Sequence, residues 1–208
     1  LAVIEGARRD GFIVKEVRKK ERRRNPAPPF TTSTLQQEAS RKLGFRVSRT
    51  MRAAQQLYEG LDIGEEGTVG LVTYIRTDST RVSDEAVGQA AAFVSERYGQ
   101  SYVQPRKWGK ARQGVQGAHE AIRPTSVART PDAVREHLTA DQYKLYKLIW
   151  ERFLASQMAA AVLDTVSVSI QSGGHLFRAT GSRVKFPGFT TVYTEGRDEG
   201  AGEREGHL

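Results

Sequence analysis

The sequence has no cysteine among its 208 residues, which excludes disulfides and thiolate-based zinc sites within it. Its 4 histidines are scattered and match no metal-binding spacing. No apolar run approaches the roughly 20 residues that a bilayer-spanning helix needs, and no signal peptide is visible. We therefore expect a soluble, cytoplasmic polypeptide of one large domain or two small ones. Because the chain opens with Leu1 rather than Met, we expect it to be a segment of a longer protein.

Positive charge, in contrast, is abundant, with a formal net charge of +8. The basic residues gather in three clusters: Arg18–Arg24, Arg41–Arg52 and Arg106–Arg112. Arg41–Arg52 contains no acidic residue, and Arg18–Arg24 contains only Glu21. Most such runs are solvated faces and loops. Three of them, next to segments rich in Tyr, Thr and Ser, nevertheless favour a polyanionic partner, above all a phosphate backbone.

The two ends of the chain have the periodicity of β-strands. Gly11–Val17 is a short β-rich run, and Asn25–Pro29 (NPAPP) then interrupts regular structure. From Asp164 onward apolar and polar residues alternate, and a turn at Ser172–Gly174 leads into a further strand at Leu176–Thr180. The pattern predicts an α+β fold in which the β-rich ends pair with each other and a helical domain is inserted between them.

The middle of the chain has the periodicity of helices. Ser33 and Gln36 predict a capping box for a first helix, which ends at Gly44. A second helix is predicted from Ser48 to about Glu59. The sharp join between the two helices, with basic side chains on both, has the character of a helix-turn-helix unit.

Three further elements follow the second helix. The apolar, β-branched stretch Val69–Ile75 predicts a buried strand or extended segment. Ser83 predicts the cap of another helix. The apolar stripe of that helix has amphipathic spacing: Val87, Ala90, Ala91, Val94 and Tyr98. Thr139–Ala160 predicts a long helix with one aromatic and aliphatic side.

The stretch Thr73–Thr80 (TYIRTDST) contains the residues best suited to chemistry on a phosphodiester. A tyrosine hydroxyl can displace one oxygen of a phosphodiester, provided that a cation or proton acceptor is nearby. On an extended segment Tyr74 and Arg76 point to the same side, so both can meet one phosphate. Three short polar side chains that can hold backbone or sugar follow them: Thr77, Asp78 and Ser79. The competing interpretation is a tyrosine at the edge of the core, the usual role of a lone Tyr beside a strand.

Two further stretches place polar residues at the spacing of one helical turn. His119 and Arg123 would share a helix face, where His119 could hold a phosphate or shuttle a proton and Glu120 could orient it. Gln55 and Glu59 have the same spacing on the second predicted helix. Either pair is also compatible with a solvated helix surface, and H-E-x-x-R is not the H-E-x-x-H zinc signature.

Taken together, these motifs resemble those of the type IA DNA topoisomerases, the bacterial enzymes above all. The likeness lies in the amino-acid sequences and the order of five stretches that span nearly the whole chain: Pro26–Phe45, Ala53–Gly60, Glu65–Thr80, Gly117–Thr125 and Phe177–Phe189. The resemblance implies part of a toroidal enzyme, with an arch (domain II) at 1–32 and 161–208. A mostly helical, tyrosine-bearing domain III would occupy 33–160.

The resemblance also implies roles for individual residues. Tyr74 would be the nucleophile that attacks single-stranded DNA and becomes linked to the 5′ phosphate, with Arg76 and His119 assisting at the active site. We further assign a set of residues to DNA binding: Gln55, Glu59, Thr77, Asp78, Ser79, Arg49 and Arg123. Such an enzyme relaxes negative supercoils and consumes no high-energy cofactor.

The resemblance also implies that part of the active site lies in other domains of the enzyme. Family members bind Mg²⁺ through an acidic cluster in a separate TOPRIM domain, and no D-x-D pattern occurs in this sequence. We therefore expect no cofactor bound here and negligible cleavage by this chain alone. The expected partners are single-stranded DNA and the enzyme's own TOPRIM and remaining toroid domains. We expect no membrane partner, and a monomer in the bacterial cytoplasm, associated with the nucleoid.

A function of another class is a non-catalytic basic module that grips nucleic acid. Replacing Tyr74 by Phe separates the two, because only an enzyme would lose cleavage. A tyrosine recombinase or type IB enzyme also uses Tyr and Arg on phosphate, but here Tyr74 precedes the His and the second Arg, in the type IA order. These residues leave open whether the parent protein carries zinc ribbons or a helicase half.

Overall fold

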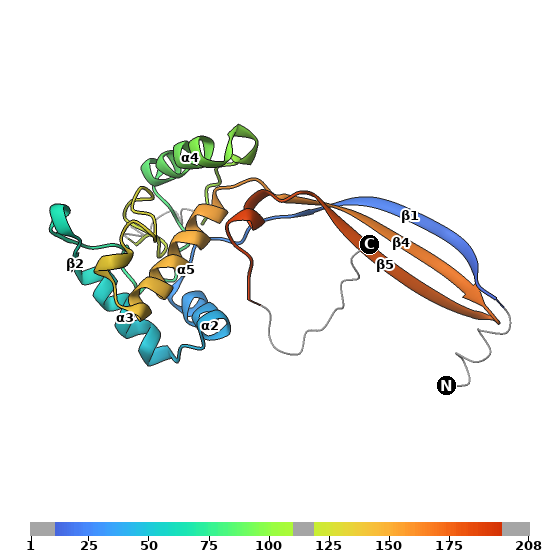
Figure 1. Cartoon of the computed structure of the whole chain (residues 1–208), viewed down its shortest axis with the longest axis horizontal. Coiled ribbons are helices and arrows are strands. Elements are labelled where there is room, and N and C mark those ends of the chain that lie inside the picture. The colour runs from blue at the N-terminus through green and yellow to red at the C-terminus, as the bar shows by residue number, and fades with distance from the viewer. Residues whose placement is uncertain (1–10, 110–118, 197–208) are drawn as a thin grey trace, which may run out of the picture. The chain divides into compact units, whose positions relative to one another are not determined.

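The computed structural model describes residues 11–109 and 119–196, and its contacts divide the chain into two compact units (Figure 1). Of the described residues, the sheet unit comprises 11–24 and 160–187, and the helical unit comprises 25–109, 119–159 and 188–196. The arch and domain III assigned from the sequence divide the chain differently. Residues on either side of the sheet-forming segments pack into the helical unit, where Phe30 and Tyr193 are buried.

The sheet unit is a three-stranded antiparallel sheet in the order β1-β4-β5, formed by β1 (Ile13–Arg24), β4 (Ala161–Ser172) and β5 (His175–Phe186). The turn between β4 and β5 requires left-handed backbone at Gly173 and Gly174, with φ of 52° and 78°. The predicted pairing of the β-rich ends is confirmed by the ladder between β1 and β4. The strand β1 is longer than predicted and includes the whole first basic cluster.

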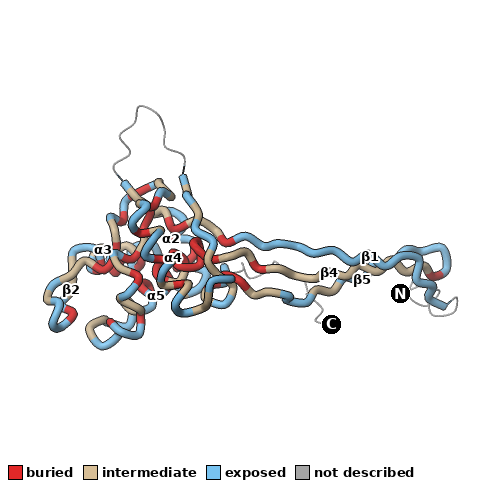
Figure 2. Tube along the Cα trace, turned by 90° about the horizontal axis from the view of Figure 1, so that it is seen from above, coloured by how far each residue is buried: buried red, intermediate tan, exposed pale blue. Residues whose placement is uncertain are grey.

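The sheet has no second layer against it within the described residues of its unit. Every residue of β1 is exposed, and most of β4 is only half-buried (Figure 2). Charged side chains are tolerated along β1 because both of its faces meet water. Large apolar side chains are exposed here as well: Phe12, Ile13, Val14, Val17, Leu176 and Val184.

The described residues of the helical unit form four helices: α2 (Thr32–Leu43), α3 (Val47–Glu59), α4 (Asp84–Tyr98) and α5 (Ala140–Ser156). The core lies along α5, most of whose residues are buried, among them the fully buried Tyr146. A two-stranded ladder follows α3: β2 (Leu61–Asp62) and β3 (Thr68–Val69). In the part of the unit that the structure describes there are also four 3-10 turns: Gly64–Glu66, Gln100–Tyr102, Arg135–His137 and Gly188–Thr191. None of the helices in the described ranges is both long and apolar enough to cross a bilayer.

The ends of the helices test the predicted caps. Gly44 ends α2 in the left-handed conformation, at φ 64°, as predicted. The Ser83 side chain caps α4 by accepting the Ala86 amide, also as predicted. The capping box at Ser33 and Gln36 is wrong, because α2 begins earlier. Its box is formed by Thr31 and Thr34, each accepting the other's backbone amide.

The stretch from His119 to Thr125 is extended, so the prediction that His119 and Arg123 share a helix face is wrong. Isolated bridges join Ile122 to Phe30 and Pro124 to Val72. The Ile122 amide donates to the Phe30 carbonyl at 2.8 Å. In a helix this amide would instead donate to a carbonyl four residues earlier in the chain. The stretch predicted as a strand or extended segment at Val69–Ile75 is extended, and its Val72 is the partner of Pro124 in the second bridge.

Candidate active site

Tyr74 lies in an extended segment that is held firmly on its N-terminal side. The Thr73 amide donates to the Arg123 carbonyl at 3.0 Å, and the Arg123 amide donates to the Thr73 hydroxyl at 3.0 Å. The same hydroxyl donates to the Ala121 carbonyl at 2.7 Å. Thr73, which sequence reasoning did not single out, therefore fastens the tyrosine segment to the stretch that follows His119.

The segment is held equally on its C-terminal side by Thr32, the first residue of α2. The Thr32 hydroxyl donates to the Ile75 carbonyl at 2.8 Å and accepts the Thr77 amide at 2.9 Å. The Thr77 hydroxyl is buried and accepts the Ser79 amide at 3.0 Å. The Ser79 hydroxyl in turn accepts the Arg81 amide at 3.1 Å. Thr77 and Ser79, both assigned to DNA binding, therefore use their hydroxyls to accept hydrogen bonds from nearby backbone amides.

Exposure alternates along the segment as expected for extended backbone. Tyr74, Arg76 and Asp78 are exposed, while Ile75 and Thr77 are buried between them. The predicted placement of Tyr74 and Arg76 on one side agrees with this alternation. Within the described parts of the chain, no hydrogen bond or ion pair engages the side chain of Arg76 or Asp78. A phosphate beside Tyr74 would therefore find an unpaired guanidinium on the same side.

The fold brings His119 to Tyr74, although the two are far apart in sequence. Their ring centroids lie 5.2 Å apart, with the planes inclined by 31°. The ring of Tyr58 packs edge to face on Tyr74 from α3, at 5.5 Å between centroids. Sequence reasoning missed Tyr58, whose only signal was its place between Gln55 and Glu59 in the same motif. The three rings form an aromatic row at which Tyr74 remains 38% exposed.

Gln55 and Glu59 lie on α3 at the spacing that the sequence predicted. The Gln55 side-chain amide donates to the Glu59 carboxylate at 2.6 Å. Glu59 is exposed, and Gln55 is half-buried. The pair therefore presents a polar surface on the same helix that carries Tyr58, whose ring contacts Tyr74.

The two arginines assigned to DNA binding outside the tyrosine segment are held by carboxylates. Arg123 is paired with Glu120 at 2.7 Å, and its side chain is only 13% exposed. Arg49 donates to both carboxylate oxygens of Asp141, each at 2.7 Å. Arg49 also lines a shallow pocket together with Arg52. In this arrangement either arginine must leave its carboxylate before it can bind a phosphate through the same nitrogen atoms.

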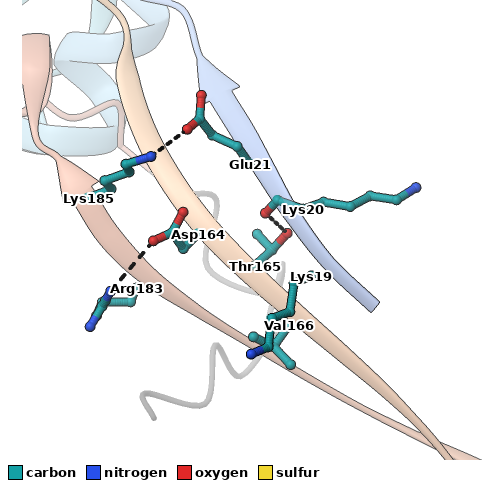
Figure 3. Close-up of a pocket in the computed structure, with 8 residues that line it drawn as sticks. All are labelled: Lys19, Lys20, Glu21, Asp164, Thr165, Val166, Arg183 and Lys185. Carbon is teal, nitrogen blue, oxygen red and sulfur yellow. Dashed lines mark hydrogen bonds and ion pairs between the residues drawn. The ribbon is translucent and has the colours of Figure 1, made fainter. Parts of the chain in front are cut away.

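The first basic cluster, Arg18–Arg24, lies in the sheet unit, where Arg18 pairs with Glu16 at 2.6 Å and Arg23 with Glu21 at 3.9 Å, and cations of β5 pair with acidic residues beside the cluster. Figure 3 shows Lys185 reaching Glu21, at 2.8 Å, and Arg183 reaching Asp164, at 3.6 Å. The hydrogen bond from Lys185 lowers the pKa of the Glu21 carboxyl. These are exposed pairs, and each stabilises the sheet only weakly.

The second and third basic clusters are partly engaged within the helical unit. The Lys42 ammonium stands over the Tyr193 ring, 3.9 Å from its centroid, and burial lowers the pKa of Lys42. Lys107 pairs with Asp84 at 2.9 Å. Two members of the third cluster lie outside the described residues: Lys110 and Arg112. Across the described ranges, no three His, Asp or Glu side chains gather where they could hold a metal ion.

Two comparisons with known proteins both relate this chain to DNA topoisomerases. Residues 2–205 match the sequence model of a family described as DNA topoisomerase. The chain is also similar to the solved structure of full-length topoisomerase I from Thermotoga maritima in a monoclinic crystal form, with 40% sequence identity and a TM-score of 0.81. That similarity covers 99% of this chain but 34% of the other, so this chain spans about a third of the length of its relative.

Proposed function

This chain belongs to the bacterial type IA DNA topoisomerases, and on that premise we propose that it supplies the nucleophile with which such an enzyme cleaves and rejoins single-stranded DNA. The position of Tyr74 carries the proposal. Its side chain is exposed, its ring lies beside His119, and the backbone on both sides is fixed by Thr73 and Thr32. A tyrosine that served only the core would be buried, as Tyr146 is.

The proposed reaction is a reversible transesterification. The Tyr74 hydroxyl oxygen forms a bond to phosphorus as the bond from phosphorus to the 3′ oxygen breaks. The phenol loses its proton, the 3′ oxygen gains one, and the phosphate stays on its 5′ carbon as a phosphotyrosine. Attack by the 3′ hydroxyl then reverses these changes, so that no high-energy cofactor is needed and negative supercoils can relax between the two steps.

Each neighbour of Tyr74 has a part in this proposal. Arg76, exposed on the same side of the segment, binds the non-bridging oxygens of the scissile phosphate. His119, next to the Tyr74 ring, holds the phosphate or carries a proton. We assign the contacts with the DNA strand on either side to the polar surface of α3 at Gln55 and Glu59, and to Asp78.

We further propose that the rest of the site lies in other domains of the enzyme. We assign the binding of Mg²⁺ to those domains, and every step of the transesterification to this chain's own groups. A TOPRIM domain would bring the acidic residues that bind Mg²⁺. It follows that this chain alone, a monomer, cleaves DNA negligibly, and that its partners are single-stranded DNA and the remaining toroid domains. We place the whole enzyme in the bacterial cytoplasm, at the nucleoid.

The experiment that tests this proposal is cleavage of a labelled single-stranded oligonucleotide, followed by a denaturing gel that retains covalent adducts. This chain is compared alone and together with a separately made TOPRIM-containing piece and Mg²⁺. We expect an adduct only in the mixture, and none when the mixture contains Tyr74→Phe. Tight DNA binding without an adduct in a mixture shown to assemble would favour a non-catalytic binding module instead.

A further inference from the structure

Three aromatic rings form the row at the candidate active site, and the proposed reaction uses only two of them. Tyr58, the next-to-last residue of α3, meets the ring of Tyr74 edge to face, with centroids 5.5 Å apart and planes inclined by 68°. His119 stands 5.2 Å from the same ring. Tyr58 is therefore a direct neighbour of the proposed nucleophile.

The backbone beside Tyr58 is in contact with the segment that carries Tyr74. The Leu57 carbonyl accepts the Leu71 amide at 2.7 Å. A β-carbon on Gly70 would lie 2.7 Å from the Tyr58 carbonyl oxygen, so only glycine lets the two backbones approach this closely. The end of α3 and the start of the tyrosine segment are thus fixed relative to each other, and so are the backbones that carry the two rings.

Core packing does not account for an aromatic side chain at position 58. The Tyr58 side chain is 39% exposed, so it contributes little to the interior. Its hydroxyl has no hydrogen-bond partner within the described ranges. What remains is the ring contact itself, and edge-to-face pairs of aromatic rings are favourable beyond the area that they bury.

We propose that Tyr58 is a positioning residue, whose ring restricts the side-chain torsions of Tyr74 so that the hydroxyl is presented to the scissile phosphate. The inference rests on the proposed role of Tyr74. An exposed tyrosine side chain populates several staggered rotamers, and in-line attack at phosphorus requires one of them. Holding the ring in place raises the fraction of molecules that are ready to react.

Single-turnover cleavage of a single-stranded oligonucleotide by the full-length enzyme tests this proposal, with the oligonucleotide Kd measured separately by fluorescence anisotropy. We expect Tyr58→Ala to lower the cleavage rate constant about tenfold, equivalent to about 1.4 kcal/mol, and to change Kd by less than about twofold. Tyr58→Phe keeps the ring and should keep the rate. Tyr58→Leu, which keeps apolar bulk without a ring, should be as slow as Tyr58→Ala.

The matched control is Tyr98→Ala at the end of α4, where the ring pairs with that of Tyr102 at 6.1 Å. It should leave both the rate and Kd unchanged. The proposal is overturned if Tyr58→Ala cleaves at the wild-type rate, if Tyr58→Phe is as slow as Tyr58→Ala, or if the loss appears in Kd alone, as it would for a residue that stacks on a base. An adduct that survives Tyr74→Phe would contradict the role of Tyr74 itself, whatever Tyr58 does.

Discussion

The carbonyl oxygen of Tyr58 lies 2.7 Å from the place that a β-carbon on Gly70 would occupy. Because this oxygen belongs to the backbone of α3, it cannot move aside as a flexible side chain would. We expect Gly70→Ala to displace the Tyr74 segment, to destabilise the protein by about 1–3 kcal/mol and to slow cleavage. Denaturant unfolding and single-turnover cleavage measure the two effects.

The control for this substitution is Gly88→Ala in α4, where a β-carbon would meet no described atom within 4 Å beyond its chain neighbours and the nearby backbone of its own helix. It should stabilise the protein by about 0.5–1 kcal/mol, since alanine favours a helix interior over glycine. Cleavage should not change. A Gly70→Ala protein as stable and as active as the wild type would show that the segment does not depend on its close approach to α3.

A second prediction concerns Arg49, which Asp141 holds at 2.7 Å through both carboxylate oxygens. Asp141→Asn should free the guanidinium, tighten binding of single-stranded DNA a few-fold at low salt, and steepen the salt dependence by about one unit of slope. Fluorescence anisotropy over a salt series measures this. The double variant with Arg49→Ala should lose the gain. An affinity unchanged by Asp141→Asn would show that Arg49 does not reach the DNA.

The same pair predicts a pH dependence. The hydrogen bond from Arg49 lowers the pKa of Asp141 in the folded protein. A carboxyl whose folded pKa is depressed contributes stability at and above its unfolded pKa, and this contribution is lost as the pH falls through the folded pKa. The wild type should therefore lose more stability than Asp141→Asn as the solution is acidified below the ordinary aspartate range, as followed by thermal unfolding. Parallel acid profiles for the two proteins would contradict the pair.

A further prediction concerns Arg152, a buried cation of α5. It donates to the Pro28 carbonyl at 2.7 Å and to the Tyr193 hydroxyl at 3.2 Å, and it pairs with Glu195 at 3.0 Å. Removing one partner of a buried polar network leaves the others unsatisfied, so Arg152→Ala should destabilise the protein by about 3 kcal/mol. Arg52→Ala, at an exposed position of α3, should change stability by less than about 0.5 kcal/mol. Equal unfolding free energies for the two variants would refute the structural role of Arg152.

Much of the fold could be predicted because its signals are local. Gly44 and Ser83 marked helix ends through their own backbone and side-chain preferences, and the strict alternation in β4 marked a strand. The stretch after His119 was predicted wrongly for the opposite reason. A spacing of four suited a helix, but the Ile122 amide found its partner in Phe30, which is remote in sequence. Long-range pairing of this kind leaves no mark on the spacing of side chains.

In the candidate site, too, the local features could be predicted and the contacts between distant parts of the sequence could not. Tyr74 and Arg76 could be placed on one side from the geometry of extended backbone alone. The contact of Tyr58 with Tyr74 depends on how the end of α3 meets the tyrosine segment, which no local pattern encodes. Arg49 and Asp141 are equally far apart in sequence, so their ion pair could not be predicted from the basic cluster. Counting the basic residues of that cluster therefore overestimated the positive charge available to bind DNA.

The most direct test of the account is to locate the covalent link in the full-length enzyme. The enzyme is reacted with a single-stranded oligonucleotide, the adduct is trapped by denaturation, and mass spectrometry of its peptides identifies the modified residue. We predict a nucleotide joined to Tyr74 through its 5′ phosphate, with unmodified Tyr58 and no adduct from Tyr74→Phe. A link at Tyr58 or any other residue, or an undiminished yield from Tyr74→Phe, would contradict the assignment of Tyr74 as the nucleophile.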